Sequence, residues 1–219
     1  MSISLAAGLD AGLDALSLDL KPAQRQSLLD YLALLQKWNQ VYNLTAVRDP
    51  QAMLSHHLLD CLSVVAPLRV QLASLAQTGP TRLLDVGSGA GLPGLVLAIC
   101  LPDVQVDCVD TVAKKASFIQ QAALSLGLPN LRGLHARVES LGSAYQVVSA
   151  RAFSSLPDLV TGSDKALLPG GLWMAMKGKT PDEEIQALTP QVQVFHVEPL
   201  QVPGLDAQRC IVWMRRVSV

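Results

Sequence analysis

The sequence predicts an α/β protein with a mostly parallel sheet of seven strands, the last of them antiparallel, and a helical N-terminal extension. From residue 79 onward, short apolar runs alternate with helix-like segments, as in βαβ units whose sheet is covered by helices on both faces. Before that residue, apolar side chains recur every three or four positions, the period of a helix with one buried face. With 219 residues, 50% hydrophobic and 16% charged, the chain can bury a core, which excludes a disordered segment, a coiled coil and a disulfide-stapled mini-protein.

The N-terminal extension is predicted to cover residues 1–78 and to contain two helices. From about Pro22 to Tyr42, leucines and aromatic residues fall on one helical face. A second helix is expected from Ala52 to about Ala66, where Pro67 would end it. The periodicity is then lost before Gly79-Pro80, a typical junction, so residues 79–219 form the predicted sheet domain.

Seven apolar runs are the candidate strands of the sheet domain. They are Arg82–Val86, Val104–Val109, Leu131–His135, Gln146–Ala150, Leu172–Met176, Val192–Val197 and Cys210–Met214. Helices are expected at about 93–100, 114–126 and 156–168. Because no long helix pattern separates the last two strands, we expect them to form an antiparallel hairpin at the sheet edge.

Composition narrows the class of partner. The sequence contains no run of about 18 apolar residues, and its first twenty residues are acidic where a secretory signal would be basic, so we expect a cytoplasmic protein with no membrane partner. The four cysteines are far apart and form no Cys-x-x-Cys pair, which indicates buried thiols and no metal site. Residues 110–180 carry eight basic and four acidic side chains, a bias that favours an anionic partner.

The most informative segment is a glycine-rich loop after the first predicted strand. The strand ends in Asp85-Val86, and glycines follow at positions 87, 89, 91 and 94. Glycine lets a backbone turn sharply and lets a ligand approach without a Cβ in the way. In open α/β sheets, ligands bind at the carboxyl ends of the strands, so this loop is predicted to contact a ligand.

Two ligands fit the loop. Gly89-x-Gly91-x-x-Gly94, with Asp110 at the end of the second strand, also satisfies the dinucleotide fingerprint. Asp85 before the glycines, and the lack of an evident hydride-transfer pair, favour S-adenosylmethionine. The Asp110 carboxylate could accept hydrogen bonds from ribose hydroxyls, or cap the helix that follows. Val138 and Glu139, after the third strand, are placed to meet an adenine.

Several motifs in a fixed order give the chain a family resemblance. They are Lys37-Trp38-Asn39, Tyr42-Asn43-Leu44-Thr45, His57-Leu58-Leu59-Asp60, the segment Asp85–Gly94, Ser149–Phe153 and Met176-Lys177-Gly178. In these the chain resembles the glucose-inhibited division protein B family, also called RsmG. Cys61 departs from the pattern, since such sequences usually have Ser there.

The resemblance implies a class I, Rossmann-like methyltransferase fold that transfers the methyl group of S-adenosylmethionine to N7 of a guanine in 16S rRNA, guanosine 527. It implies that the RNA is met free or within the 30S subunit or its precursor. Together with the loop, it places the cofactor contacts at Asp85, Gly87, Gly89, Gly91, Leu92, Asp110, Val138, Glu139 and Arg151. A monomer is the expectation for the protein itself.

The implied chemistry needs alignment and no general base, because N7 already presents an unprotonated lone pair. Arg151 and Lys177 are the predicted substrate-positioning cations, expected to contact O6 or phosphate, since a cation on N7 would oppose the charge that arrives there. N7 faces the deep groove of A-form RNA, so the target base should be unpaired or flipped out. The cations expected to meet RNA are Lys114, Lys115, Arg137, Arg151 and Lys177, with Arg132 and Lys179 as further candidates.

Two other functions remain open at this point: a nicotinamide-dependent oxidoreductase, and a non-catalytic ribosome-assembly module with a vestigial pocket. Trp38 and Tyr42 are expected to pack against the sheet domain. The i and i+3 spacing of His57 and Asp60 favours a local hydrogen bond between them. Asn43 is a further candidate for the base pocket.

Overall fold

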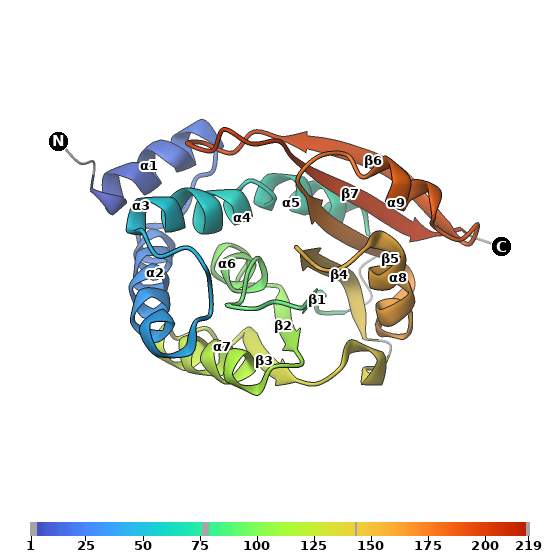
Figure 1. The fold of residues 1–219 in the computed structure, drawn as a ribbon, viewed down its shortest axis with the longest axis horizontal. Helices are drawn as coiled ribbons and strands as arrows, with labels where there is room; N and C mark the ends of the chain where they lie inside the picture. The colour runs from blue at the N-terminus through green and yellow to red at the C-terminus, as the bar shows by residue number, and fades with distance from the viewer. Residues whose placement is uncertain (1–3, 76–78, 143, 218–219) are drawn as a thin grey trace.

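The computed structural model describes residues 4–75, 79–142 and 144–217, and its centre is a seven-stranded sheet in the order β3-β2-β1-β4-β5-β7-β6 (Figure 1). The strands are β1 Arg82–Val86, β2 Gln105–Asp110, β3 Leu131–His135, β4 Tyr145–Arg151, β5 Leu167–Lys177, β6 Val192–Leu200 and β7 Arg209–Arg216. Strands β1 to β5 run parallel, whereas β7 runs antiparallel to both β5 and β6. The predicted fold class and the hairpin at the sheet edge are confirmed.

Helices account for most of the remaining chain. They are α1 Leu5–Ala15, α2 Pro22–Tyr42, α3 Pro50–Met53, the π-helix η1 Leu54–Leu59, α4 Asp60–Leu62, α5 Val65–Ser74, α6 Gly94–Cys100, α7 Ala113–Ser125, the 3-10 helix η2 Val138–Ser140, α8 Leu156–Ser163, the 3-10 helix η3 Asp164–Ala166 and α9 Asp182–Gln186. None of the helices in the described ranges is both long and apolar enough to cross a bilayer.

Two expected boundaries are wrong, for different reasons. The helix expected at 156–168 ends at Ser163, because the Leu167-Leu168 segment is drawn into β5 beside β4. Pro67 ends no helix: it lies in the first turn of α5, where proline is tolerated because its missing N–H has no intrahelical partner. The helical segment before it runs as α3, η1 and α4 and ends at Leu62.

Helices α1, α5 and α9 were not among the predicted helices, and α1 has the least helical sequence of the three. Its sequence, LAAGLDAGLDA, contains two glycines, which have low helix propensity. They allow close packing, because a Cβ on Gly8 would lie 2.7 Å from Leu54 Cδ2 and one on Gly12 would lie 2.4 Å from Leu59 Cδ2, so either leucine would have to move. Helix α1 therefore lies directly against η1, a contact that local sequence does not reveal.

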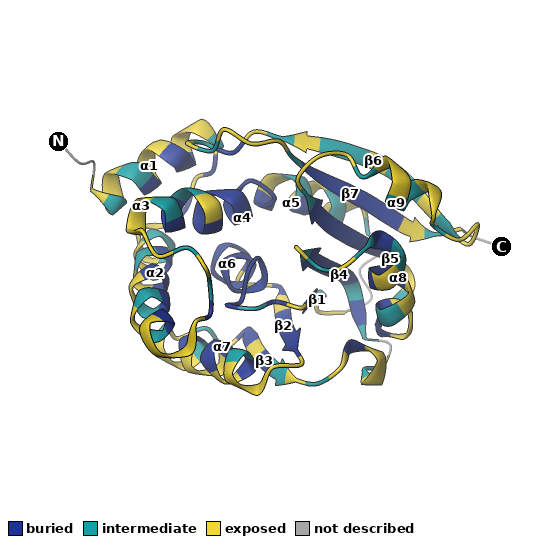
Figure 2. Cartoon of the chain, in the orientation of Figure 1, coloured by how far each residue is buried: buried dark blue, intermediate teal, exposed yellow. Residues whose placement is uncertain are grey.

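The N-terminal helices and one face of the sheet share a single hydrophobic core. Buried leucines of α1 and α2 belong to the same cluster as α6, Phe118 of α7 and Trp213 of β7. All seven residues of α6 are buried, since this helix lies between the sheet and the N-terminal helices (Figure 2). The expected junction at residues 78 and 79 adjoins residues 76–78, which lie outside the described residues.

The carboxyl ends of the parallel strands meet at one edge of the sheet. Asp110 of β2 is in register with His135 of β3, and Val86 of β1 is in register with Ala150 of β4. Strand order reverses beside β1, because β2 lies on one side of it and β4 on the other. This reversal opens the crevice in which α/β sheets bind ligands.

Candidate active site

The glycine-rich loop leaves β1 at this crevice in a conformation that requires glycine. Gly87, Gly89 and Gly91 have φ angles of +65°, +57° and +87°, in the left-handed region. The N–H of Gly87 donates to Val109 O at 2.9 Å, which ties the start of the loop to β2. Around Gly89, no heavy atom lies within 4 Å of where a Cβ would be, so the loop presents bare backbone to open space.

Asp85 holds the loop from below. Its side chain has no solvent exposure; Oδ2 accepts the N–H of Gly94 at 3.0 Å, and Oδ1 accepts the hydroxyl of Ser149 at 2.9 Å. Burial raises the pKa of this carboxyl to about 7, although both hydrogen bonds oppose the shift. Asp85 was expected among the cofactor contacts, and its position is that of a residue that shapes the loop.

Asp110 connects the loop to the second strand. Its Oδ2 accepts the N–H of Gly89 at 3.0 Å, and its Oδ1 accepts the N–H of Val112 at 2.9 Å. The ammonium of Lys115 lies 3.5 Å from Oδ2. An ionised carboxylate has about four acceptor sites, so these contacts leave capacity for ribose hydroxyls. Asp110 thus joins the Gly89 turn to the backbone just before α7; it is not the cap of that helix, because the N-cap residue is Val112 and no side chain caps it.

The other wall of the crevice comes from β4. Ala152, directly after the strand, has φ +53°, an uncommon left-handed conformation for a residue with a Cβ. Phe153 then lies over the loop, because a Cβ on Gly87 would be 2.8 Å from Phe153 Cδ2. In the sequence Phe153 is visible only as the end of the Ser149–Phe153 motif, and no local signal predicts this contact.

The expected adenine contacts lie on η2, beyond β3. Val138 is buried, whereas Glu139 is exposed and its carboxylate faces solvent. The N–H of Ala136 donates to Asp110 O at 3.3 Å, which places this segment beside the end of β2. Leu92, the last of the predicted loop contacts, is buried at the start of the turn that leads into α6.

Arg151 ends β4 and binds the N-terminal helices. Its Nη1 donates to His56 O and to Asp60 Oδ2, both at 2.9 Å. Asp60 is buried and also accepts Nε of Arg209 through Oδ1 at 2.9 Å. One carboxylate therefore pairs with arginines from β4 and β7 and ties η1 and α4 to the crevice rim.

His57 lies beside this cluster in place of the expected local hydrogen bond with Asp60. Its Nε2 is 2.8 Å from Thr45 Oγ1, in the segment that follows α2. Burial, and after it the charge of the nearby Arg151, lower the pKa of His57 to about 4, so the ring is neutral at pH 7. The prediction of a His57–Asp60 pair is wrong because Asp60 is taken by arginines distant in sequence.

Lys177 ends β5 in a similar ion pair. Its ammonium is 2.7 Å from Glu184 Oε2 on α9, and it donates to Ser154 O at 3.3 Å. Glu184 Oε2 also accepts the N–H of Leu156 at the start of α8. Lys177 therefore joins the segments after β4 and β5, and no signal in the sequence pointed to Glu184.

The expected RNA-facing cations divide into two groups. Lys114 and Arg137 are exposed near the carboxyl edge, and Lys179 is exposed just after β5. Arg132 is engaged elsewhere: its Nε and Nη2 bind the two oxygens of the buried Asp107 at 2.7 and 2.6 Å. Asp107 also accepts from Tyr145 and Arg82, both at the amino ends of their strands. Arg132 is thus held in a structural cluster on the other half of the sheet.

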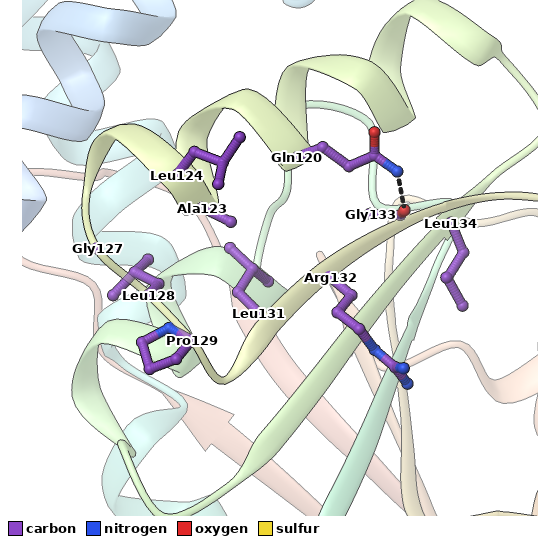
Figure 3. A pocket seen from close by; sticks show the side chains of 10 residues that line it. All are labelled: Gln120, Ala123, Leu124, Gly127, Leu128, Pro129, Leu131, Arg132, Gly133 and Leu134. Carbon is purple, nitrogen blue, oxygen red and sulfur yellow. Dashed lines mark hydrogen bonds between the residues drawn. The ribbon is translucent and has the colours of Figure 1, made fainter.

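A surface hollow of about 680 Å³ lies apart from the crevice, between α7 and the edge strand β3 (Figure 3). Its lining is mostly apolar and includes Leu128, Pro129 and the 79% exposed Leu124. Gln120 closes part of it by donating to Gly133 O at 2.9 Å. These residues come from the second half of α7, the turn after it and β3, so the hollow lies at the edge strand of the sheet and apart from the ends of β1 and β2.

Comparisons with known proteins agree with this geometry. Residues 24–212 match the model of the GidB family, described as rRNA small subunit methyltransferase G. A protein of Paracidovorax citrulli named ribosomal RNA small subunit methyltransferase G is 62% identical over 97% of this chain and 90% of its own length. A protein of Acidovorax ebreus with the same name is also 62% identical, over 98% of this chain and 97% of its own length.

Solved structures show the same fold at low identity. TrmN from Thermus thermophilus superposes with a TM-score of 0.55 at 20% identity and covers 75% of this chain and 53% of its own. A SAM-dependent methyltransferase from Aquifex aeolicus gives a TM-score of 0.54 at 16% identity and covers 77% of this chain and 94% of its own. Since the fold is that of methyltransferases and the family match spans most of the residues that build the crevice, the chain belongs to the rRNA small subunit methyltransferase G family.

Proposed function

We propose that this protein transfers the methyl group of S-adenosylmethionine to N7 of a guanine in 16S rRNA. The observation that carries the proposal is the match over nearly the whole chain to relatives named ribosomal RNA small subunit methyltransferase G. The nicotinamide-dependent oxidoreductase and the non-catalytic assembly module find no support among these names. Guanosine 527 is the proposed nucleotide.

The crevice fits the proposed cofactor. The backbone of Gly89 faces open space, and that of Gly87 lies under the ring of Phe153. Beside them, the Asp110 carboxylate can accept further hydrogen bonds. Gly87, Gly89, Asp110 and the η2 segment would hold the cofactor, with Asp85 setting the loop beneath it. When bound, S-adenosylmethionine supplies a methyl group on a positively charged sulfur, which is the electrophile.

The protein's own task is alignment. The N7 lone pair needs no proton removed, so no base is called for, and positioning alone can lower the barrier by roughly 7–11 kcal/mol in ideal cases. Positive charge arrives on the base, and an uncompensated cation beside N7 would oppose it. Arg151 forms an ion pair with Asp60, and Lys177 forms one with Glu184. Because the carboxylates compensate their positive charge, the two cations can hold O6 or a phosphate close to N7 without opposing the charge that arrives on the base.

The partner in solution is proposed to be the 30S subunit or its precursor, with free 16S rRNA as the alternative substrate. The protein is proposed to act as a monomer, and in the cytoplasm because its substrate is ribosomal. The cations proposed to meet RNA phosphates are Lys114, Lys115, Arg137, Arg151 and Lys177.

A methyl-transfer assay tests the proposal. Radiolabelled S-adenosylmethionine and the purified protein would be incubated with free 16S rRNA and with 30S subunits, both from cells that lack the enzyme. We expect label in 16S rRNA, and strand cleavage after borohydride and aniline treatment at one guanine. Absence of label in both substrates, or label without the cleavage diagnostic of 7-methylguanosine, would contradict the proposal.

A further inference from the structure

Helix α2 ends in an exposed aromatic ring. Tyr42 is the last residue of α2 and is 39% exposed. Its ring stacks on Trp38, with centroids 5.0 Å apart and an interplanar angle of 29°. Because one face lies against Trp38, the exposed surface belongs to the other face and the edge.

The stack is held rigidly from behind. Trp38 packs edge-on against Phe118 of α7, with ring centroids 5.5 Å apart. Phe118 is fully buried and lies 6.4 Å from the ring of Tyr31, which is buried as well. The Tyr42 ring is therefore the outermost layer of an aromatic column rooted in the core, and presenting its face costs little side-chain entropy.

The direction of α2 places this ring on the carboxyl side of the sheet, the side to which the glycine-rich loop belongs. Near its start, Gln24 donates to Ile99 O at the end of α6, and further along Tyr31 donates from its hydroxyl to Ala90 O in the glycine-rich loop, at 2.8 Å. Helix α2 thus runs antiparallel to α6, from the amino side of the sheet toward its carboxyl edge. Tyr42 lies three turns beyond Tyr31 in that direction.

Exposed cations lie near Tyr42 in sequence and near Phe118 on α7. Lys37 and Arg48, on either side of Tyr42 in sequence, are exposed, and Lys114 lies one turn before Phe118 on α7. None of these three forms an ion pair among the residues that the structure describes. Asp49 is the nearby acid in sequence, and it caps α3 by accepting the N–H of Ala52. Arg48 donates to Asn43 Oδ1 at 3.1 Å and keeps its charge uncompensated. An exposed aromatic face combined with cations that have no carboxylate partner is the arrangement that binds single-stranded nucleic acid.

We propose that Tyr42 is a stacking platform for an unpaired base of the rRNA, close to the target guanine. The inference rests on the proposed function, and it names how that substrate is held. A base stacked on the outer face would continue the column of Tyr42, Trp38 and Phe118. The N7 of a guanine is reachable only outside a regular helix, so an unpaired neighbour is available wherever the target is exposed. The ring gives no base preference, because every base has an aromatic face.

Kinetics with four proteins test the platform. The wild type, Tyr42→Ala, Tyr42→Phe and Val41→Ala would be compared in methyl transfer to 30S subunits at saturating cofactor. Tyr42→Ala should raise KM for the subunit roughly 5- to 100-fold, as expected for one lost stacking contact. Tyr42→Phe should stay within about twofold of wild type, because it keeps the ring. Val41→Ala is the matched control, since Val41 is 71% exposed on the same turn and has no ring.

The cofactor affinity of all four proteins should be equal, and thermal unfolding would confirm that each is folded. If the wild type transfers methyl groups and Tyr42→Ala has an unchanged KM, the platform is wrong while the proposed function stands. If the wild type transfers none, the proposed function fails and a binding measurement still decides on the platform.

That measurement uses a mixed-sequence 12-nucleotide RNA and the fluorescence of Trp38. Binding should quench this emission, and Trp38→Phe should abolish the signal, since Trp173 and Trp213 are fully buried. Tyr42→Ala should weaken binding by the same 5- to 100-fold, whereas an oligomer of the same length with abasic sites should bind wild type and Tyr42→Ala alike. Equal affinity of Tyr42→Ala and Val41→Ala for the normal oligomer would overturn the proposal.

Discussion

At the scale of single residues, a substitution at Gly89 should affect cofactor affinity much more than stability. Its φ of +57° disfavours a side chain, but the space around its absent Cβ is open. Gly89→Ala should therefore lower the free energy of unfolding by only about 1 kcal/mol. Because the added methyl group points into the crevice, affinity for S-adenosylmethionine should fall by roughly tenfold or more. Calorimetric titration and urea unfolding measure the two effects.

Gly127 supplies the matched control for that substitution. It has φ +63° and equally open surroundings, but it lies after α7, by the hollow that lies apart from the crevice. Gly127→Ala should cost similar stability and leave cofactor affinity unchanged. If both substitutions weakened cofactor binding equally, the loop would not be the binding element.

Asp85 and His57 give opposite contributions to the pH dependence of stability. The pKa of Asp85 rises to about 7 in the folded protein because of burial, so its contribution is full below its ordinary 3.8 and is lost as the pH rises toward 7. The pKa of His57 falls to about 4, so its contribution is full above its ordinary 6.5 and is lost as the pH falls toward 4. Over the same window the two largely cancel.

Asp85→Asn should reveal the contribution of His57 to the pH dependence of stability, because the opposing contribution of Asp85 is removed. The amide keeps an oxygen for the N–H of Gly94 and offers its NH₂ to Ser149 Oγ. The free energy of unfolding of the variant should then rise from pH 4.5 to 7, relative to wild type, by a few kcal/mol, on the order of the Asp85 shift. Urea unfolding at four pH values checks this. Parallel curves for the two proteins would show that Asp85 is ionised with an ordinary pKa.

At the scale of elements, the Asp60 carboxylate holds η1 and α4 to the sheet. It is buried and pairs with Arg151 and Arg209. Asp60→Asn should leave two partly buried arginines without a counter-charge and lower the free energy of unfolding by about 3 kcal/mol or more. Asp10→Asn, which removes one of the two exposed carboxylates near Arg25, should cost less than about 1 kcal/mol. Equal effects in urea unfolding would contradict the assigned role of Asp60.

The strands and the glycine-rich loop could be predicted from the sequence, whereas the ion pairs of Asp60 and Lys177 could not. The strands were predictable because buried parallel strands are short apolar runs between turn residues, and Arg82–Val86 and Leu131–His135 match the structure at both ends. The glycine loop and Asp110 were predictable because their chemistry is local. The partners of Asp60 lie 91 and 149 residues away, and the Glu184 partner of Lys177 lies on a short helix with no periodic signal. Such contacts depend on strand order, which periodicity does not encode.

At the scale of the whole molecule, the net charge of −1 gives no general attraction to RNA. Binding must then depend on where the cations lie. Lys114 and Arg137 lie near the carboxyl edge, while Lys165 lies just before β5 and therefore at the amino edge. All three are exposed. Each cation that meets a phosphate releases counterions on binding, so it adds close to one unit to the slope of log affinity against log salt.

Replacing the cations one at a time should therefore separate the two edges. Lys114→Gln and Arg137→Gln should each flatten the salt slope of binding to 16S rRNA by about 0.7 to 0.9, and the double substitution by about twice that. Lys165→Gln makes the same change in net charge and should leave the slope unaltered. Filter binding between 50 and 300 mM salt measures the slopes. If all three substitutions flattened the slope equally, RNA binding would depend on net charge alone, and this would contradict the carboxyl edge as the RNA-binding face.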